Sequence, residues 1–315
     1  MDSPDKRGLD AVRPVFIIGA PRSGTSVTTW ALGQHANIQP MPETGWIASM
    51  GVAAFLSWRK GSERGRYSHL SNADYPLEPF LERVGESIDR IVGDVFDARC
   101  NRMYGDFRDT GELRNRKEGP RHPLQLMRSV ADPKRRWIDG TPLNTQYLWI
   151  LAGLFPHARF IHNLRRPDAV ATSLEGFATV GADPQPLEEG LRTWIQHTEN
   201  AWFAERAFGA GRVYRLDFER LSGDREALLR EVLAFLGEPY DPNCLLPLRK
   251  RLNSSEVDDR REENLARLRA LEPFMTAEAL HGQVVAGPVP DTGEPAALEV
   301  LRQRFLDYCH ERSLV

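Results

Sequence analysis

A short stretch near the amino terminus, VFIIGAPRSGTS (15–26), brings together residue types that can bind a phosphate group. An apolar run ends at Gly19, and Gly24 follows five residues later. Loops that bind nucleoside triphosphates have this spacing of glycines, followed directly by a lysine. Thr25 stands where that lysine would be, and Arg22 supplies a positive charge three residues earlier. The stretch therefore predicts a phosphate-binding loop whose cation lies inside the loop.

The elements expected around this loop support an anion site. The apolar residues before Gly19 indicate a short buried strand, and a helix is predicted from Thr25 to Gly33. The N–H groups that open such a helix, together with its dipole, attract an anion, and the hydroxyl groups of Thr25 and Ser26 add donors. A triphosphate needs the missing lysine and a magnesium ion. A single 5′-phosphate that carries a different transferable group instead needs its cation where Arg22 lies.

The PRSGTS motif resembles the 5′-phosphosulfate loop of sulfotransferases that use 3′-phosphoadenosine 5′-phosphosulfate (PAPS) as the donor. In that family the loop has a proline, a basic residue, a serine or threonine, a glycine, a threonine, and a further serine or threonine. The resemblance implies that the donor is bound by Pro21, Arg22, Ser23, Gly24, Thr25 and Ser26. It also implies a catalytic role for Arg22, which would stabilise the negative charge that grows on the departing phosphate oxygen.

The resemblance further implies a second anion site, for the 3′-phosphate of the donor. The stretch FIHNLRRPDAVATS matches that site, with Arg165 after a strand, Pro167 two residues later, and Ser173 on the following helix. An arginine can bind phosphate through two parallel hydrogen bonds, and the Ser173 hydroxyl group could add another. We expect Arg166 to be solvated, and His162, on an apolar strand, to be a core histidine with its hydrogen bonds satisfied.

An acceptor hydroxyl group must lose a proton, so a base is needed near the transferred group. The turn NIQPMPETGW (37–46) offers Glu43. In several sulfotransferases that act on sugars or tyrosyl residues, a glutamate in this region serves as the catalytic base, and the resemblance implies that role for Glu43. His69 is the alternative base, because cytosolic aryl sulfotransferases use a histidine.

Two departures from the family pattern bear on the activity. The segment WIDGTPLN (137–144) matches a family segment in which a lysine often precedes Thr-Pro, but Gly140 stands at that position. The chain also lacks the Arg-Lys-Gly loop of cytosolic sulfotransferases, so it resembles the bacterial, carbohydrate and tyrosyl types more closely.

A later stretch could contact the nucleotide, although a solvated helical surface is the simpler explanation for its arginines. Its candidates are Asn253, Ser254, Arg260 and Arg261.

Strands that alternate with helices predict an α/β fold with a parallel sheet. Besides the first strand, HARFIHNL (157–164) and RVYRLDF (212–218) are predicted to be strands, each followed by a helix. The resemblance implies one P-loop-like domain over 1–315 with three α/β/α layers. We expect its core at about 13–48 and 136–240, a helical insertion at about 50–135, and a helical carboxyl-terminal region at about 241–315. Within that last region, residues 282–295 indicate a loop, and a final helix is expected at about 296–312.

Composition limits the classes to which the protein can belong. Its 315 residues are 41% hydrophobic, which allows a sizeable core, and the formal net charge of −3 gives no general attraction to nucleic acid or to an anionic membrane. The amino terminus is polar, without the apolar run of a signal peptide, and no segment is apolar for long enough to span a bilayer. The three cysteines, Cys100, Cys244 and Cys309, match neither a disulfide framework nor a metal site. We therefore expect a reduced, cytoplasmic protein without a metal.

Taken together, these features predict a PAPS-dependent sulfotransferase. The resemblance implies in-line transfer of the sulfuryl group from PAPS to a hydroxyl group of a carbohydrate, a tyrosyl residue or a small metabolite, leaving 3′-phosphoadenosine 5′-phosphate (PAP). Two alternatives stay open: a P-loop kinase or other NTPase, with Asp217 or Asp139 holding magnesium, and a nucleotide-binding protein without chemistry. Basic stretches at 114–122 and 133–136 could meet an acidic acceptor, although solvated loops explain them more simply. The sequence does not indicate an oligomeric state.

Overall fold

A parallel sheet forms the centre of the protein. The computed structural model describes residues 13–104, 132–176, 183–249 and 261–312. The strands of this described part lie in the order β2-β3-β1-β4-β5, and each neighbouring pair is parallel. Their bounds are β1 Val15–Ile18, β2 Ile38–Pro40, β3 Arg136–Asp139, β4 Arg159–Leu164 and β5 Val213–Asp217. The predicted α/β fold with a central parallel sheet is confirmed.

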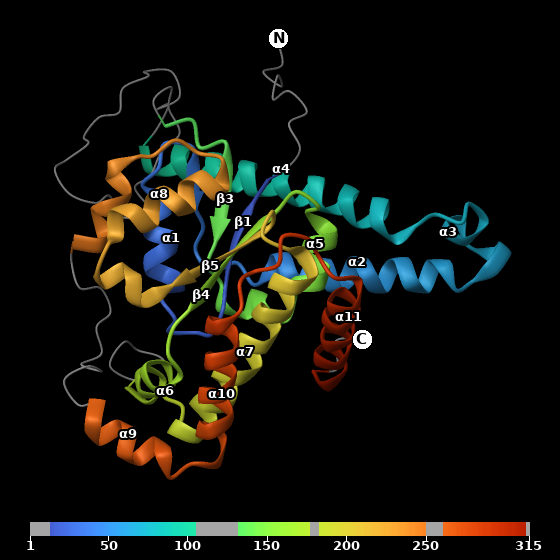
Figure 1. Cartoon of the computed structure of the whole chain (residues 1–315). Helices are drawn as coiled ribbons and strands as arrows, with labels where there is room; N and C mark the ends of the chain where they lie inside the picture. Colours follow the sequence, from blue (N-terminus) through green and yellow to red (C-terminus); the bar gives the residue numbers. More distant parts are fainter. Residues whose placement is uncertain (1–12, 105–131, 177–182, 250–260, 313–315) are drawn as a thin grey trace.

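Both faces of the sheet are buried under helices, as the apolar runs in its strands require. Successive strand residues point to opposite faces. Along β1, Val15 and Ile17 belong to one apolar cluster with α1 and α8, whereas Phe16 and Ile18 belong to another with α5 and α7. Figure 1 shows these helices on either side of the sheet, so the three predicted layers are confirmed. The helices are α1 Thr25–Gly33, α5 Leu148–Leu154, α7 Leu187–Phe208 and α8 Arg225–Leu236.

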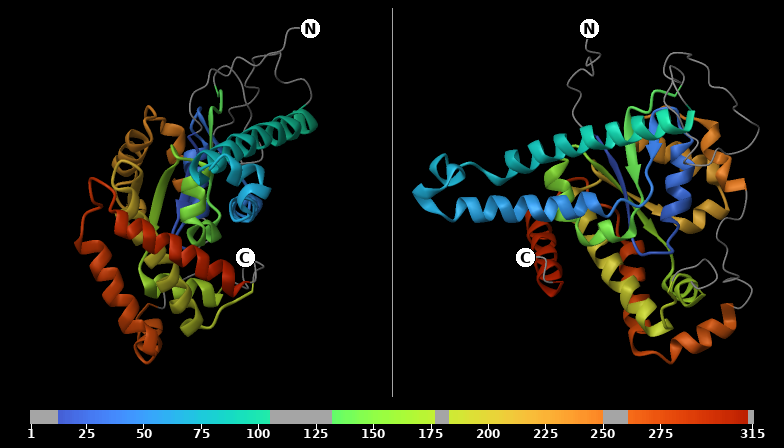
Figure 2. Two further views of the ribbon diagram at one scale, coloured as in Figure 1. Left: turned by 90° about the vertical axis from the view of Figure 1, so that its right-hand side faces the viewer. Right: turned by 180° about the vertical axis from the view of Figure 1, so that it is seen from behind.

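Two long helices project from the sheet as an antiparallel pair. Helices α2 (Trp46–Ser62) and α4 (Leu77–Tyr104) lie side by side, with the short α3 (His69–Asn72) and the 3-10 turn η1 (Gly65–Tyr67) at their outer end (Figures 1 and 2). Nearer the sheet, α2 buries apolar residues such as Phe55 in the cluster that contains α5. The region expected to be a helical insertion is thus helical over its first part. Among the described helices, none is both long and apolar enough to cross a bilayer.

The carboxyl-terminal region is mostly helical where it is described. Helix α10 packs against α6 and α7, and its Val284 is fully buried in their apolar cluster. Because this burial favours helix up to Ala286, the prediction of a loop was wrong for residues 282–286. The final helix, α11, lies close to its predicted place. The remaining elements are α6 Pro167–Glu175, α9 Arg261–Arg269, α10 Glu272–Ala286, α11 Pro295–Glu311, η3 Pro142–Gln146, η5 Phe218–Ser222, η6 Pro242–Leu245 and η7 Pro247–Arg249.

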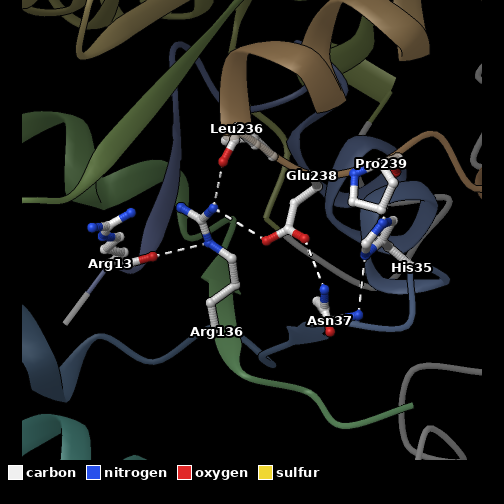
Figure 3. A network of polar contacts seen from close by, with 7 residues as sticks. All are labelled: Arg13, His35, Asn37, Arg136, Leu236, Glu238 and Pro239. Atoms are coloured by element: carbon white, nitrogen blue, oxygen red, sulfur yellow. Dashed lines mark hydrogen bonds and ion pairs between the residues drawn. The ribbon is translucent and has the colours of Figure 1, made fainter. Parts of the chain in front are cut away.

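A polar network joins the amino end of β3 to the segments before β1 and after α8 (Figure 3). The Arg136 side chain is only 9% exposed, and its Nη1 donates a hydrogen bond to the Leu236 carbonyl oxygen at 2.8 Å. The same nitrogen lies 3.5 Å from the Glu238 carboxylate, which also accepts a hydrogen bond from Asn37 at 2.9 Å. The Arg136 Nε donates to the Arg13 carbonyl oxygen at 3.0 Å. The guanidinium group therefore links three segments that are distant in the sequence: the residues before β1, the beginning of β3 and the end of α8.

Lys134 is buried, although a lysine rarely is unless it has partners. Its ammonium group donates to the carbonyl oxygens of Gly33 at 3.1 Å, His35 at 2.7 Å and Ile38 at 3.0 Å. Gly33 is the last residue of α1, and the dipole of a helix favours a positive charge at its carboxyl end. Lys134 thus fixes the end of α1 to the beginning of β2.

The expectation that residues 133–136 form a solvated or acceptor-facing basic loop was wrong for Lys134 and Arg136, whereas Arg135 is exposed. Lys134 is enclosed by carbonyl groups, and Arg136 is enclosed by the network at the start of β3. Lys134 and Arg136 both donate hydrogen bonds to groups inside the protein. A buried cation needs such acceptors for its N–H groups. The other basic stretch, 114–122, lies outside the described residues.

Replacing Lys134 by methionine should destabilise the fold strongly. The change keeps an apolar stem of similar length but removes the shared donor of three buried carbonyl oxygens, at a cost of about 3–5 kcal/mol. Chemical denaturation measures the free energy of unfolding. Lys60→Met, at an exposed position of α2, is the matched control and should change it by less than about 0.5 kcal/mol. A Lys134→Met protein as stable as the wild type would contradict this role of the ammonium group.

Candidate active site

The turn that joins β1 to α1 requires glycine at both of its ends. Gly19 has φ +127°, and a β-carbon there would lie 2.5 Å from the Asn163 carbonyl oxygen. Gly24, the residue before α1, has φ +93°, and a β-carbon there would lie 2.1 Å from the Phe218 ring. Residues with a side chain rarely adopt such conformations. The two glycines therefore let the backbone turn tightly against β4 and η5.

The amino end of α1 offers donors for an anion. In the described part of the chain no side chain caps this helix at Gly24, and the first N–H groups of any α-helix lack acceptors within the helix. The Thr25 side chain is buried, whereas Ser26 is exposed. The Ser23 hydroxyl group donates to the Ala20 carbonyl oxygen at 2.6 Å, so this residue shapes the turn. The arrangement has the form expected of a phosphate cradle.

Arg22 holds an unusual backbone conformation within the turn. Its φ of +66° lies in the left-handed region, which costs a non-glycine residue about 1–2 kcal/mol. Two contacts offset that strain: the Arg22 carbonyl oxygen accepts a hydrogen bond from Arg165 Nη1 at 2.9 Å, and its Nε donates to Ser173 Oγ at 2.9 Å. Pro21 and Arg22 are half-buried, and burial lowers the pKa of the Arg22 guanidinium below its usual value.

The sheet itself brings Arg22, Arg165 and Ser173 together. Strands β1 and β4 are parallel neighbours, with Ile18 opposite His162, so the loops that follow them meet at the same edge. The strand order also reverses here, because the chain leaves β1 toward β2 and β3 but leaves β4 toward β5 on the other side. In open parallel sheets, ligands bind outside the carboxyl ends of the strands at such a point. The residues predicted for the two anion sites thus lie side by side.

Both the side chain and the backbone of Arg165 make contacts that fix its position. The guanidinium lies over the Phe218 ring, with Cζ 4.8 Å from the ring centroid, which is within the range of a cation–π contact. The carbonyl oxygen accepts a hydrogen bond from Trp194 Nε1 at 2.9 Å. Because Phe218 follows β5 and Trp194 lies on α7, two further elements orient the residue predicted to bind the 3′-phosphate.

Sequence reasoning did not single out two residues that hold the turn in place. Thr145, on η3, accepts a hydrogen bond from the Gly19 N–H at 3.0 Å and donates its own hydroxyl proton to the Gly19 carbonyl oxygen at 3.2 Å. Asn163, on β4, donates from Nδ2 to Thr28 Oγ1 at 2.8 Å. An asparagine inside an apolar strand is a signal that could have found Asn163. For Thr145 the sequence carries no such signal.

Glu43 lies at the same edge of the sheet as the turn, because β2 runs parallel to β3 and β3 to β1. Glu43 is an exposed residue. Partial burial of its carboxyl group, and then the negative charge of Asp139, raise the pKa of that group above its usual value. A carboxylate whose pKa moves toward neutrality becomes a better proton acceptor at neutral pH.

Asp139 is buried, and hydrogen bonds fill its carboxylate. Its Oδ1 accepts the Thr141 N–H at 2.9 Å and the Thr141 hydroxyl group at 2.6 Å. Its Oδ2 accepts the Thr44 hydroxyl group at 2.6 Å and Asn144 Nδ2 at 2.8 Å. A carboxylate has about four acceptor positions, so Asp139 has none to spare for the magnesium ion of the NTPase alternative. Asp217, the other acid of that alternative, is exposed and accepts a hydrogen bond at the start of η5.

Gly140 stands where the resemblance implies a lysine, and the structure leaves no space for a side chain there. A β-carbon on Gly140 would lie 2.0 Å from Thr29 Oγ1. The Thr29 hydroxyl group is itself held by the Thr25 carbonyl oxygen at 2.8 Å. Helix α1 therefore occupies the volume that the first atom of a lysine side chain would need.

Three other candidates are not part of the turn. His69 lies on α3 at the outer end of the α2–α4 pair (Figure 1), so the structure does not bring it to the other site residues. His162 is buried with Nδ1 2.6 Å from the Glu205 carboxylate, as expected of a core histidine, although its Nε2 has no partner among the described residues. Arg166 is not simply solvated, since its Nε lies 3.3 Å from the Asp168 carboxylate. Of the later candidates, Arg261 begins α9, and Asn253, Ser254 and Arg260 lie outside the described residues.

A sequence model of the sulfotransferase family matches residues 14–242. The match spans the turn after β1, the segment with Glu43 and the junction of β4 with α6. This chain therefore belongs to the sulfotransferase family, as the PRSGTS motif implies.

Two curated relatives are much longer than the matched region. An uncharacterized protein of Aquifex aeolicus (strain VF5) is 27% identical over 251 residues, which cover 76% of this chain and 27% of that protein. Nodulation protein NoeE of Sinorhizobium fredii (strain NBRC 101917 / NGR234) is 29% identical over 160 residues, which cover 51% of this chain and 30% of that protein. The chain thus spans less than a third of the length of either relative.

Solved structures with a similar chain include two bacterial sulfotransferases. The sulfotransferase domain from the Synechococcus PCC 7002 olefin synthase is 19% identical, with a TM-score of 0.44, covering 94% of this chain and 96% of that one. Sulfotransferase STF9 from Mycobacterium avium is 16% identical, with a TM-score of 0.40, covering 96% of this chain and 77% of that one.

Introducing the lysine of many relatives, Gly140→Lys, should lower the free energy of unfolding by about 1–3 kcal/mol, because the new β-carbon overlaps the Thr29 hydroxyl group. Adding Thr29→Ala removes the overlapping atom and should recover part of that loss. Thermal unfolding of the two single variants and the double variant measures the coupling between the positions. An equal effect of Gly140→Lys with and without Thr29 would show that the two residues do not clash.

Proposed function

We propose that this chain transfers a sulfuryl group from PAPS to an acceptor hydroxyl group and leaves PAP. The observation that carries the proposal is the placement of Arg22, whose side chain contacts Ser173 and whose carbonyl oxygen contacts Arg165. One arginine thus joins the turn predicted for the 5′-phosphosulfate to the residues predicted for the 3′-phosphate. Membership of the sulfotransferase family supports sulfuryl transfer.

The donor groups of the site fit a ligand with two separate anionic ends. Arg22 and the N–H groups that open α1 would hold the 5′-phosphosulfate, and Arg165 and Ser173 would hold the 3′-phosphate. When bound, PAPS supplies the activated sulfuryl group, so the protein needs to supply position and charge. The remaining residues of the turn complete the proposed donor site: Pro21, Ser23, Gly24, Thr25 and Ser26.

In the proposed reaction the acceptor oxygen bonds to sulfur as the bond between sulfur and the phosphate oxygen breaks. Glu43 takes the acceptor proton, which its raised pKa favours. Arg22 and the amides of the turn stabilise the negative charge that develops on the phosphate oxygen. Catalysis then depends on holding the base and the cation at fixed positions around the transferred group.

The proposed acceptor is a carbohydrate, a tyrosyl residue or a small metabolite. The P-loop kinase or NTPase is less well supported, because hydrogen bonds occupy the Asp139 carboxylate. A nucleotide-binding protein without chemistry would bind PAP but transfer no labelled sulfate. A cytoplasmic location is part of the proposal and is supported by Cys244 and Cys309, which are buried and unpaired.

PAP should bind more tightly than AMP, because the 3′-phosphate gains charged hydrogen bonds. Such bonds contribute about 1.5–3 kcal/mol, or roughly a 10-fold to 100-fold difference in Kd. Isothermal titration calorimetry measures both nucleotides. Arg165→Ala should remove most of the difference, and it should weaken AMP binding to a smaller degree, because the Arg22 carbonyl oxygen also loses its hydrogen bond. Equal affinities of the wild type for PAP and AMP would contradict the two-site arrangement.

Glu43→Gln should lower kcat/KM by about 100-fold or more, since a positioned base contributes that much to proton transfer. Glu63→Gln, at an exposed position after α2, is the control and should have no effect. Transfer is measured with radiolabelled PAPS and a panel of phenols, sugars and hydroxylated peptides.

The same base predicts the pH dependence of the wild type. The base acts when ionised, so the rate should fall on the acid side with a midpoint above the ordinary glutamate pKa of about 4.3, because the pKa of Glu43 is raised. Glu43→Gln should lose this acid limb. A variant that keeps the limb would assign the base to another residue.

A further inference from the structure

Thr44, the residue after Glu43, is bonded to the end of β3. Its N–H donates to Thr141 Oγ1 at 2.9 Å, and its hydroxyl group donates to Asp139 Oδ2 at 2.6 Å. The peptide unit between Glu43 and Thr44 is therefore held by β3 and the residues that follow it. Strand β2 ends at Pro40, before Glu43, so the pairing of β2 does not by itself hold Glu43 in place.

The residues after β3 also contact the donor turn. Thr145 exchanges two hydrogen bonds with Gly19 at the end of β1. Gly140 packs so closely on α1 that no side chain fits between it and Thr29. The loop from Asp139 to Thr145 thus connects the segment with the proposed base to the turn with the proposed anion site.

The carboxylate of Asp139 holds this loop in shape, because it binds Thr141 and Asn144 at the same time as Thr44. With both oxygens fully used, Asp139 itself cannot act as the base. We propose that Asp139 is a positioning residue that, through Thr44, sets the place of Glu43 relative to the donor turn. This inference rests on the proposed function, in which Glu43 accepts the proton.

Asp139 also acts on Glu43 through its charge. Burial first, and then the Asp139 carboxylate, raise the pKa of Glu43. Among the contacts of the two site arginines, Arg22 donates to Ser173 and Arg165 donates to the Arg22 carbonyl oxygen. Substitutions at the two residues differ in one respect. Changing Thr44 moves Glu43 but leaves the Asp139 charge in place, whereas changing Asp139 removes the charge as well.

Thr44→Val removes the hydroxyl group but keeps the shape of the side chain and the charge of Asp139. We expect kcat for sulfuryl transfer to fall about 10-fold to 100-fold, because a small displacement of a reacting group has that effect. The affinity for PAP, measured by calorimetry, should stay within about twofold of the wild type, since the donor turn is untouched. Thr44→Ser keeps the hydroxyl group and is the matched control, with near wild-type kcat.

A second measurement needs no acceptor. NMR of protein labelled at the glutamate carboxyl carbons follows the titration of Glu43, whose resonance is assigned by its loss in Glu43→Gln. Asp139→Asn should lower the pKa of Glu43, because the neighbouring negative charge is lost. Thr44→Val should lower it as well, because the Glu43 carboxylate is no longer held near Asp139, whereas Thr44→Ser should preserve it.

The two proposals fail in different ways. A wild-type protein that binds no PAP overturns the proposed function, whatever the substitutions do. A wild-type protein that binds PAP, with an unchanged Glu43 titration or an unchanged kcat in Thr44→Val, overturns the positioning role alone. Thr44→Val is a small change at a partly exposed residue. This test therefore does not depend on whether the Asp139→Asn protein folds.

Discussion

The parallel ladder between β1 and β4 is the interaction on which the candidate active site depends. Its register, with Val15 opposite Arg159 and Ile18 opposite His162, ends the two strands at neighbouring positions. Gly19 therefore lies against Asn163, and the turns that follow meet without long loops. Both faces of β1 are buried, so a slip of one residue would exchange every side chain between two different apolar clusters. The packing of the core thus holds the two proposed anion sites at one spacing.

Buried charges connect this sheet to the helices around it. Lys134 binds the carboxyl end of α1, and Asp139 binds the loop after β3. On the side of the sheet that α7 covers, burial alone would raise the pKa of Glu205. Hydrogen bonds from Arg215 and His162 outweigh burial and lower that pKa. Each of these groups is surrounded by partners, because an unpaired buried charge is strongly destabilising. Helix α1 is therefore fixed at its far end, while its amino end carries the proposed anion site.

Gly140 lies where the packing of α1 leaves no space for a side chain. The chain belongs to the sulfotransferase family, yet Thr29 of α1 fills the space next to Gly140 that a lysine would need. In the proposed reaction, the charge on the departing phosphate oxygen is then stabilised by Arg22 and the amides of the turn. Arg22 has a strained backbone conformation, and its Nε donates a hydrogen bond to Ser173.

The sequence by itself determined the elements whose signals are local. The bounds of α1 match their prediction, and α8 ends at Leu236, directly before Gly237 with φ +73°, because glycine spacing and apolar periodicity act within a few residues. Strands β2 and β3 were missed, since three or four residues that include Pro40 become strands only when a neighbour pairs with them. Only the tertiary structure decided the burial of Lys134 and the hydrogen bond between Arg22 and Ser173, which are 151 residues apart. Such contacts depend on the register and crossovers of the whole sheet, which no local pattern records.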